Sequence, residues 1–577
     1  MNTTLLIIIG LVIYFVMYFL YGKRLQRNVA KADASRETPA VRLRDDVDYM
    51  PANRYILFGH HFASIAGAAP IIGPAIAIVW GWLPAILWVW LGNIFIGAVH
   101  DYLSLMSSVR YDGRSVQWIA GRIIEKRSGK VFAWFVFFML ILVVAAFAAV
   151  LGGIFTRQPA VPTAYILKIC AALILGQLLY KMKLDLKIAT IIGVAMLILA
   201  IYLGTLFPLA LSYKTWMVVF FFYIIIAASI PVWVLLQPRD YLNAWLLVGG
   251  LVIGGVSLLV AFKGFSLPAF TAFSPPAIAG KPTPFWPIIP LIIACGSLSG
   301  FHSLVASGTS SKQLSSEMDG LFVGYGSMFT EGFLSTVVIA SIAAFGFAAL
   351  GEGAKGLTES AATFAAGYGK SIGKIGGPVG IFSKSYGIGA HEALGLPITF
   401  MTIFAGMWVA SFAMTTLDTT NRLARYCLSE IAEPWKESFP AGYNALSNRW
   451  IASVIPAFIG IGLAWTGQWK MIWPAFGGAN QILASVALIT MAVWVSKVIK
   501  SSAGYRLLVS IPAVALWFTV AAAMVWYLFV AVPVFMAKNP VQAVVLGIIV
   551  AFMMILNVVI FWDYVKVSKK VEIEATS

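Results

Sequence analysis

The sequence is short of charge and of cysteine. Only 11% of its 577 residues are charged while 60% are hydrophobic, a balance that excludes an ordinary soluble domain. Its three cysteines (Cys170, Cys295 and Cys427) are far apart with no CxxC pair, so neither a disulfide framework nor a zinc knuckle is predicted, and all three are interpreted as packing residues. No GxxxxGK[ST] motif and no nucleophile–base pair of diagnostic spacing occurs, so neither ATP-driven work nor an enzyme is predicted.

Long apolar segments are what the sequence has in abundance. A hydrocarbon layer about 30 Å thick needs about 20 apolar residues per helix, and about 15 segments of roughly that length occur between residues 4 and 564. Several contain proline or glycine, which membrane helices tolerate when neighbouring groups satisfy the freed backbone. The predicted fold class is an all-α polytopic membrane protein with about 15 transmembrane helices.

The net charge of +17 follows the predicted topology. If the N-terminus lies outside and the spans alternate, most of the 40 lysines and arginines fall in loops on the inner side, including 23–54 and 110–130. The first segment is then an uncleaved anchor, because Lys23, Arg24 and Arg27 follow it directly. We expect a multi-pass membrane protein with a cytoplasmic C-terminus, lipid as a partner and no nucleic acid bound.

The chain divides into five predicted parts. They are an N-terminal anchor helix (1–22), a basic cytoplasmic linker (23–55), a transporter core (56–417), a cytoplasmic amphipathic segment (418–450) and C-terminal accessory helices with a tail (451–577). The outer connection 351–395 is rich in glycine and lysine. It is interpreted either as a gate or partly inserted hairpin, or as a mobile loop.

The densest motif is GHHFASIAGAAPIIGP, residues 59–74. Proline removes a backbone donor and glycine adds freedom, so the second span is predicted to be interrupted near its middle. Interrupted helices expose main-chain polar groups, from which many secondary transporters build their sites. The candidate substrate-binding residues here are Ser64, Gly67, Ala68 and Pro70. A packing kink is the alternative.

Other polar groups lie inside apolar segments, where they are rare unless they line a pathway. The candidates for a proton or cation path are His60, His61, His100, Asp101, Ser299, His302, Ser303, Ser307, Glu331 and Asp418. The alternatives are a structural ion pair at His100–Asp101, tight helix packing along the serines, and a Glu331 satisfied by Thr330. A second interruption is predicted at Pro231, with Ser229 beside it as a further substrate-binding candidate.

A metal site is not predicted. Neutral imidazole is a good zinc ligand, and the histidines of the second, third and ninth spans fall in the same half of the layer. However, His60 and His61 project about 100° apart on a helix, so both rarely reach one ion. No cofactor is expected beyond a coupling cation, H⁺ or Na⁺.

Several blocks of the sequence resemble the carbon starvation protein A (CstA) family. They are FGHHFASIAGAAPIIGPAIA with WGWLPAILWVWLGNIFIGAVHDYLSL, SFAMTTLDTTNRLARY and WPAFGGANQILA, and the resemblance extends over about residues 50–500. It implies a LeuT-like core of two inverted five-helix repeats (56–208 and 215–417). Segment 56–79 would be the first core helix, 215–237 the broken sixth, and 286–308 the eighth, with Ser303 and Ser307 facing Ser64 and Ala66.

The expected function is secondary-active import by alternating access, coupled to a proton or sodium. The family resemblance implies a bacterial inner membrane as the location and peptides as substrates during carbon starvation. Pyruvate or another small monocarboxylate is the alternative substrate. A passive channel or a membrane sensor is the rival from another class. The oligomeric state stays open.

Overall fold

The computed structural model describes residues 1–45, 49–178, 182, 184–230 and 232–576, and these ranges are built from helices. The α-helices are α1 (Thr3–Met17), α2 (Pro39–Arg42), α3 (Arg54–Ile65), α4 (Ala69–Ala77), α5 (Trp82–Gly92), α6 (Ala98–Arg110), α7 (Val116–Ile123), α8 (Lys126–Arg157), α9 (Ala160–Gly176), α10 (Leu186–Leu206), α11 (Tyr213–Ser229), α12 (Val232–Ala261), α13 (Phe285–Ile292), α14 (Gly300–Gly308), α15 (Gly326–Leu350), α16 (Ala361–Lys374), α17 (Gly377–Leu394), α18 (Ile398–Ala432), α19 (Trp435–Ser438), α20 (Pro440–Ser447), α21 (Arg449–Ala464), α22 (Trp469–Val493), α23 (Ala503–Trp526), α24 (Val532–Met536) and α25 (Pro540–Thr576).

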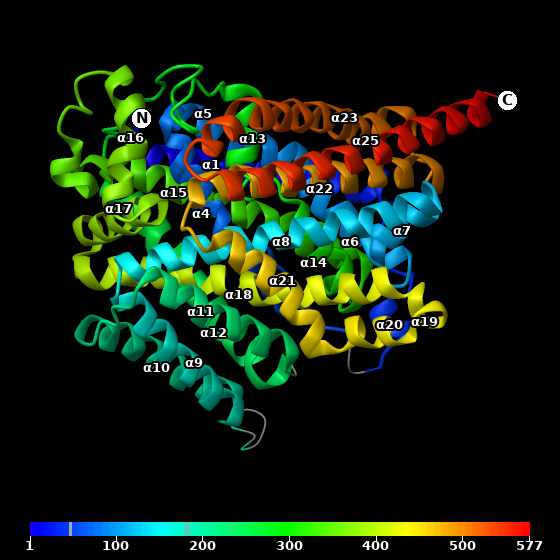
Figure 1. Ribbon diagram of the computed structural model, residues 1–577, viewed down its shortest axis with the longest axis horizontal. Coiled ribbons are helices and arrows are strands. Elements are labelled where there is room, and N and C mark those ends of the chain that lie inside the picture. Colours follow the sequence, from blue (N-terminus) through cyan, green and yellow to red (C-terminus); the bar gives the residue numbers. More distant parts are fainter. Residues whose placement is uncertain (46–48, 179–181, 183, 231, 577) are drawn as a thin grey trace.

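Several long helices, among them α8, α18, α22, α23 and α25, run roughly along the long axis of the molecule, whereas α9, α10, α11 and α12 lie obliquely to them (Figure 1). In the described part, ten are long and apolar enough to cross a membrane, or up to 12 if each bent pair is one span. Two shorter apolar helices, α9 and α11, accompany them. The all-helical multi-pass fold is confirmed, whereas these helices do not reach the predicted number of about 15.

The predicted interruption of the second span is present. Helix α3 ends at Ile65, α4 begins at Ala69, and the two helices are bent by 50°. Pro70 lies in the first turn of α4. Its missing N–H costs no hydrogen bond there, because N–H groups in the first turn have no acceptor within the helix. The glycine and proline pattern therefore predicted the break at the correct place.

Another interruption, between α13 and α14, lies where the sequence predicted one membrane span. Segment 286–308 forms two short helices, α13 and α14, joined by a non-helical connection over residues 293–299. The prediction of one span was wrong. The segment itself is apolar, and the polar side chains that bond to its non-helical backbone come from elsewhere in the chain. In segment 215–237, helix α11 ends at Ser229 and α12 begins at Val232, while Pro231 itself lies outside the described residues.

The two interrupted helices run antiparallel. Helix α4 packs on α13, and α3 packs on α14, so the second half of one lies beside the first half of the other. The approach is close at Gly73, where a Cβ would overlap the carbonyl oxygen of Ile292. Glycine is required there by contact, since no side chain fits between α4 and the end of α13.

Two predicted segment boundaries need correction. Helix α18 continues through Asp418 to Ala432, so residues 418–432 are not a separate amphipathic segment. No proline or glycine interrupts this stretch before Pro434, and its buried residues recur at helical spacing. The connection 351–395 contains α16 and the mostly buried α17, which packs against α15 and α18; the mobile-loop alternative was wrong.

Candidate functional site

The 293–299 connection is held by side chains of α22. Asn480 donates to the carbonyl oxygen of Ala294 (2.9 Å) and accepts from the backbone N–H of Phe301 (3.0 Å). Gln481 donates to the carbonyl oxygen of Leu298 (2.8 Å). Buried backbone groups must find partners, and here two amides replace the missing helical bonds.

The two interruptions are joined through α15. The Ser335 hydroxyl donates to the carbonyl oxygen of Pro70 (2.7 Å), and the same hydroxyl fills the space beside Gly296. The side-chain amide of Asn93 donates to the carbonyl oxygen of Gly296 (3.0 Å). The break at Gly67–Ala68 and the 293–299 connection therefore meet at one level of the bundle, with α15 between them.

Two histidines share one aspartate beside this junction. The Nδ1 atoms of His100 and His302 lie 2.9 and 2.8 Å from the two carboxylate oxygens of Asp101, and all three side chains are fully buried. Because a carboxylate accepts, each Nδ1 donates, which leaves the lone pair of each neutral ring on Nε2. Neither Nε2 has a hydrogen-bond partner in the described structure.

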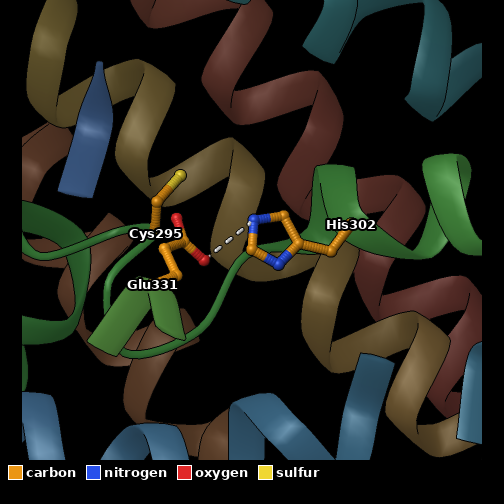
Figure 2. A group of neighbouring side chains, drawn as sticks. All are labelled: Cys295, His302 and Glu331. Carbon is orange, nitrogen blue, oxygen red and sulfur yellow. Dashed lines mark ion pairs between the residues drawn. The ribbon is translucent and has the colours of Figure 1, made fainter. Parts of the chain in front are cut away.

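The free nitrogen of His302 faces a glutamate and a cysteine. Figure 2 shows Cys295, His302 and Glu331 converging from the 293–299 connection, α14 and α15. Nε2 of His302 lies 3.5 Å from Oε2 of Glu331, and the ligand atoms of the three residues lie within 4.8 Å of one another. Two acceptors that face each other in a buried place repel unless a proton or another cation lies between them.

The other predicted histidines and serines lie around this cluster without joining it. His61 is buried and its Nδ1 is 2.7 Å from the Ser310 hydroxyl, whereas His60 is exposed. The Ser64 hydroxyl donates to the carbonyl oxygen of His60 (2.7 Å). The structure thus separates the His60–His61 pair from the His100–His302 pair.

The hydroxyls on α14 are engaged within the bundle. Ser303 donates to the carbonyl oxygen of Gly300 and Ser307 to that of Ser303 (2.7 and 2.6 Å). Ser307 also accepts from the backbone N–H of Val116 at the start of α7 (3.2 Å). Ser299 pairs with Asn480. Among the substrate-binding candidates, Ser229 donates to the carbonyl oxygen of Arg449 (3.1 Å), a contact that packs α11 against α21.

A second polar network lies beside the first break. Asp418 in this network was a predicted candidate, whereas Lys168 and Asn243 were not predicted. Lys168, fully buried, donates to Asn243 (2.8 Å) and Ser411 (2.7 Å). Arg239 pairs with Asp418, and both side chains are fully buried. The only available signal for Lys168 was a lysine within the apolar run 162–180.

This second network borders the break at Gly67. A Cβ at Gly67 would lie 3.0 Å from the Thr416 hydroxyl of α18. Thr416 is followed two residues later by Asp418 and preceded by Thr415, which accepts from the Asn243 side chain (2.9 Å). The polar groups of α9 and α12 are therefore linked through α18 to the α3–α4 interruption.

A cavity of about 260 Å³ lies beside α4, where α8 ends and α22 begins. It is lined by Ile72 of α4, Arg157 at the end of α8 and Trp469 at the start of α22, with residues of α17. Phe147 of α8 lies beside Gly67, two residues before Ala149 of the cavity wall, and its ring packs on Phe476 at 5.5 Å between centroids. An aromatic layer of Phe147 and Phe476 therefore lies at the interruption, close to the cavity wall along α8.

Comparison with known proteins agrees with the sequence motifs. The family model described as "Carbon starvation protein CstA" matches residues 2–524. The peptide transporter CstA of Bacillus subtilis (strain 168) is 31% identical, with 91% of this chain and 90% of that protein covered. The peptide transporter CstA of Escherichia coli (strain K12) is 32% identical, with 85% and 76% covered, and the pyruvate/proton symporter BtsT of the same strain is 30% identical, with 84% and 76% covered. These matches show that the chain belongs to the carbon starvation protein CstA family.

Proposed function

We propose that this protein is a secondary-active importer of peptides, used when carbon is scarce and driven by a proton through alternating access. The observation that carries the proposal is the pair of antiparallel interrupted helices, α3–α4 and α13–α14, which meet beside buried titratable side chains. Main-chain polarity at such breaks suits a substrate that carries a carboxylate. Two relatives named as peptide transporters support peptides as the substrate class.

The substrate enters through the 260 Å³ cavity, which lies on the outer side in the topology that the basic loops predict. Arg157 in its wall attracts the carboxylate. The substrate then passes Phe147 and reaches the break at Gly67–Ala68, where the N-terminus of α4 carries no side-chain cap and favours an anion. Departure on the inner side leads past the exposed His60.

The coupling proton binds between His302 and Glu331. Their facing acceptors need a cation between them, and Asp101 orients the His302 ring by accepting from Nδ1. Sodium at Ser303 and Ser307 is the weaker alternative, because both hydroxyls donate to carbonyl oxygens of their own helix. Movement of α14 relative to α15 would make and break the shared proton site.

Uptake into proteoliposomes tests the proposal. We expect labelled peptide to accumulate under an imposed inward proton gradient and not under a sodium gradient of the same size. Lack of uptake of both peptide and pyruvate under either gradient would refute secondary transport. Movement only down the substrate gradient, insensitive to protons, would instead support a passive channel.

Variants of the coupling pair sharpen this test. Glu331→Gln and His302→Ala should abolish accumulation while counterflow exchange of substrate continues, because exchange needs no net proton movement. Glu392→Gln is the matched control, since Glu392 lies on the surface in an exposed pair with Lys263. Accumulation that survives Glu331→Gln would remove this residue from the coupling step.

Pyruvate or another small monocarboxylate is the second candidate substrate. The relative named as a pyruvate/proton symporter is 30% identical, close to the identity of the peptide transporters. A binding scan of the purified protein across dipeptides, tripeptides and small carboxylates separates the two. If pyruvate binds and none of the peptides does, the substrate is the monocarboxylate.

A further inference from the structure

The Cys295–His302–Glu331 cluster has the composition and placement of a metal site. It brings together one thiol, one imidazole nitrogen and one carboxylate, with their ligand atoms within 4.8 Å of one another. All three residues are buried. They come from three different parts of the chain: the 293–299 connection, α14 and α15 (Figure 2).

The ligand atoms are available as donors of electron pairs. Nε2 of His302 and both carboxylate oxygens of Glu331 have no hydrogen-bond partner in the described structure. Buried polar atoms without partners are rare in native proteins and call for an unseen ligand or a functional reason. Since these three atoms belong to the same small volume, one cation placed there would satisfy them together.

The surroundings resemble the outer shell of a metal site. A metal-bound histidine almost always donates its other ring N–H to a carboxylate or carbonyl, which fixes the ring and its tautomer. His302 does this through Nδ1 and Asp101 at 2.8 Å. Asp101 is fixed in turn by His100 at 2.9 Å. The ring of His302 is therefore held in the tautomer that presents Nε2 as a ligand.

We propose that Cys295, His302 and Glu331 form a binding site for one divalent transition-metal ion of the zinc type, with a fourth position open to water or a small ligand. Sulfur and nitrogen ligands favour zinc, cobalt or iron, whereas calcium and magnesium take oxygen ligands. Binding releases the proton of the Cys295 thiol to solvent, because the thiolate is the metal ligand.

The geometry needs a modest closure. Bonds of about 2.0–2.3 Å to a tetrahedral zinc ion place the ligand atoms about 3.3–3.6 Å apart. The widest spacing here is 4.8 Å or less, so the three atoms must approach by about 1 Å. Rotation about the Cα–Cβ bond of Cys295 moves its sulfur while the backbone on either side stays held by Asn480 and Asn93.

The ion would compete with the coupling proton. It needs Nε2 of His302 and the carboxylate of Glu331, the two groups to which the proposed function assigns the proton. Zinc should therefore inhibit proton-driven uptake, and more strongly as the external pH rises. Binding itself does not rest on the proposed function, because it requires only the three ligands.

The test uses the purified full-length chain in detergent, stripped with a chelator and titrated with Co²⁺. We expect a thiolate-to-cobalt charge-transfer band that saturates at one ion per chain and disappears when zinc is added. Cys295→Ser should abolish the band. Cys427→Ser, which changes another buried cysteine, should leave it unchanged. Asp101→Asn should keep the band and weaken cobalt binding about 10–100-fold.

Absence of the band from the wild-type protein would overturn the proposal, and so would a band that persists in Cys295→Ser or is lost in Cys427→Ser. If Cys295→Ser does not stay monodisperse, Glu331→Gln provides the second test. It should keep the band and bind cobalt at least tenfold more weakly, and unchanged affinity would overturn the proposal. Cobalt binding by a protein that takes up neither peptide nor pyruvate would reject the transport proposal and leave the metal site standing.

Discussion

The side chain of Asn480 is predicted to maintain the interruption between α13 and α14. In Asn480→Ala, the backbone N–H of Phe301 loses its acceptor at 3.0 Å. The carbonyl oxygen of Ala294 loses its donor at 2.9 Å but keeps a weaker bond from Gln481 at 3.4 Å. One buried backbone group is therefore left fully unsatisfied, which costs about 1–3 kcal/mol.

The loss should appear both in global and in local stability. We expect Asn480→Ala to lower the free energy of unfolding in detergent by about 1–3 kcal/mol and to speed amide exchange in peptides that cover residues 293–303. Thr490→Val on the same helix is the matched control, because the Thr490 hydroxyl donates only to the Val486 carbonyl oxygen of its own helix. Unchanged exchange over 293–303 in Asn480→Ala would refute the role assigned to α22.

Three further predictions concern other parts of the bundle. Gly73→Ala should lower thermal stability and uptake, because the added Cβ would overlap the Ile292 carbonyl oxygen. Gly59→Ala is the control and should lower neither, because the space around Gly59 is open. Equal melting temperatures of the two variants would contradict the close approach at Gly73. Breaking the buried pair with Arg239→Met should lower the free energy of unfolding by about 3–5 kcal/mol, while Lys263→Gln, in an exposed pair, should change it little. Phe147→Ala should speed labelling of Thr416→Cys by a membrane-impermeant thiol reagent added from the cavity side, and an unchanged rate would mean that the aromatic layer does not close the path.

The sequence predicted the first interruption well because its cause is local. Gly67 and Pro70 act on their own turn of helix, so the pattern suffices. The interruption between α13 and α14 depends on Asn480 and Gln481, which lie 179–187 residues away in the chain from the groups to which they bond in residues 294–301. No local pattern could reveal that partnership, and the segment was therefore predicted as one continuous span.

The candidate site was predicted unevenly for a related reason. Asp101, His302 and Glu331 were predicted as candidates because they are titratable groups in apolar segments, and the structure brings them together. Cys295 was interpreted as a packing residue because a small apolar side chain carries no signal until its neighbours are known. Lys168 was missed because its acceptors, Asn243 and Ser411, belong to two other helices.

One turn of α15 has a consequence for how the molecule moves. Glu331 and Ser335 are four residues apart on this helix, so their side chains point the same way. Glu331 faces His302, while Ser335 holds Pro70 and fills the space beside Gly296. A rotation of α15 would move both contacts together, so in the proposed mechanism binding of an ion at Glu331 would be coupled through this one helix to a change at both backbone breaks.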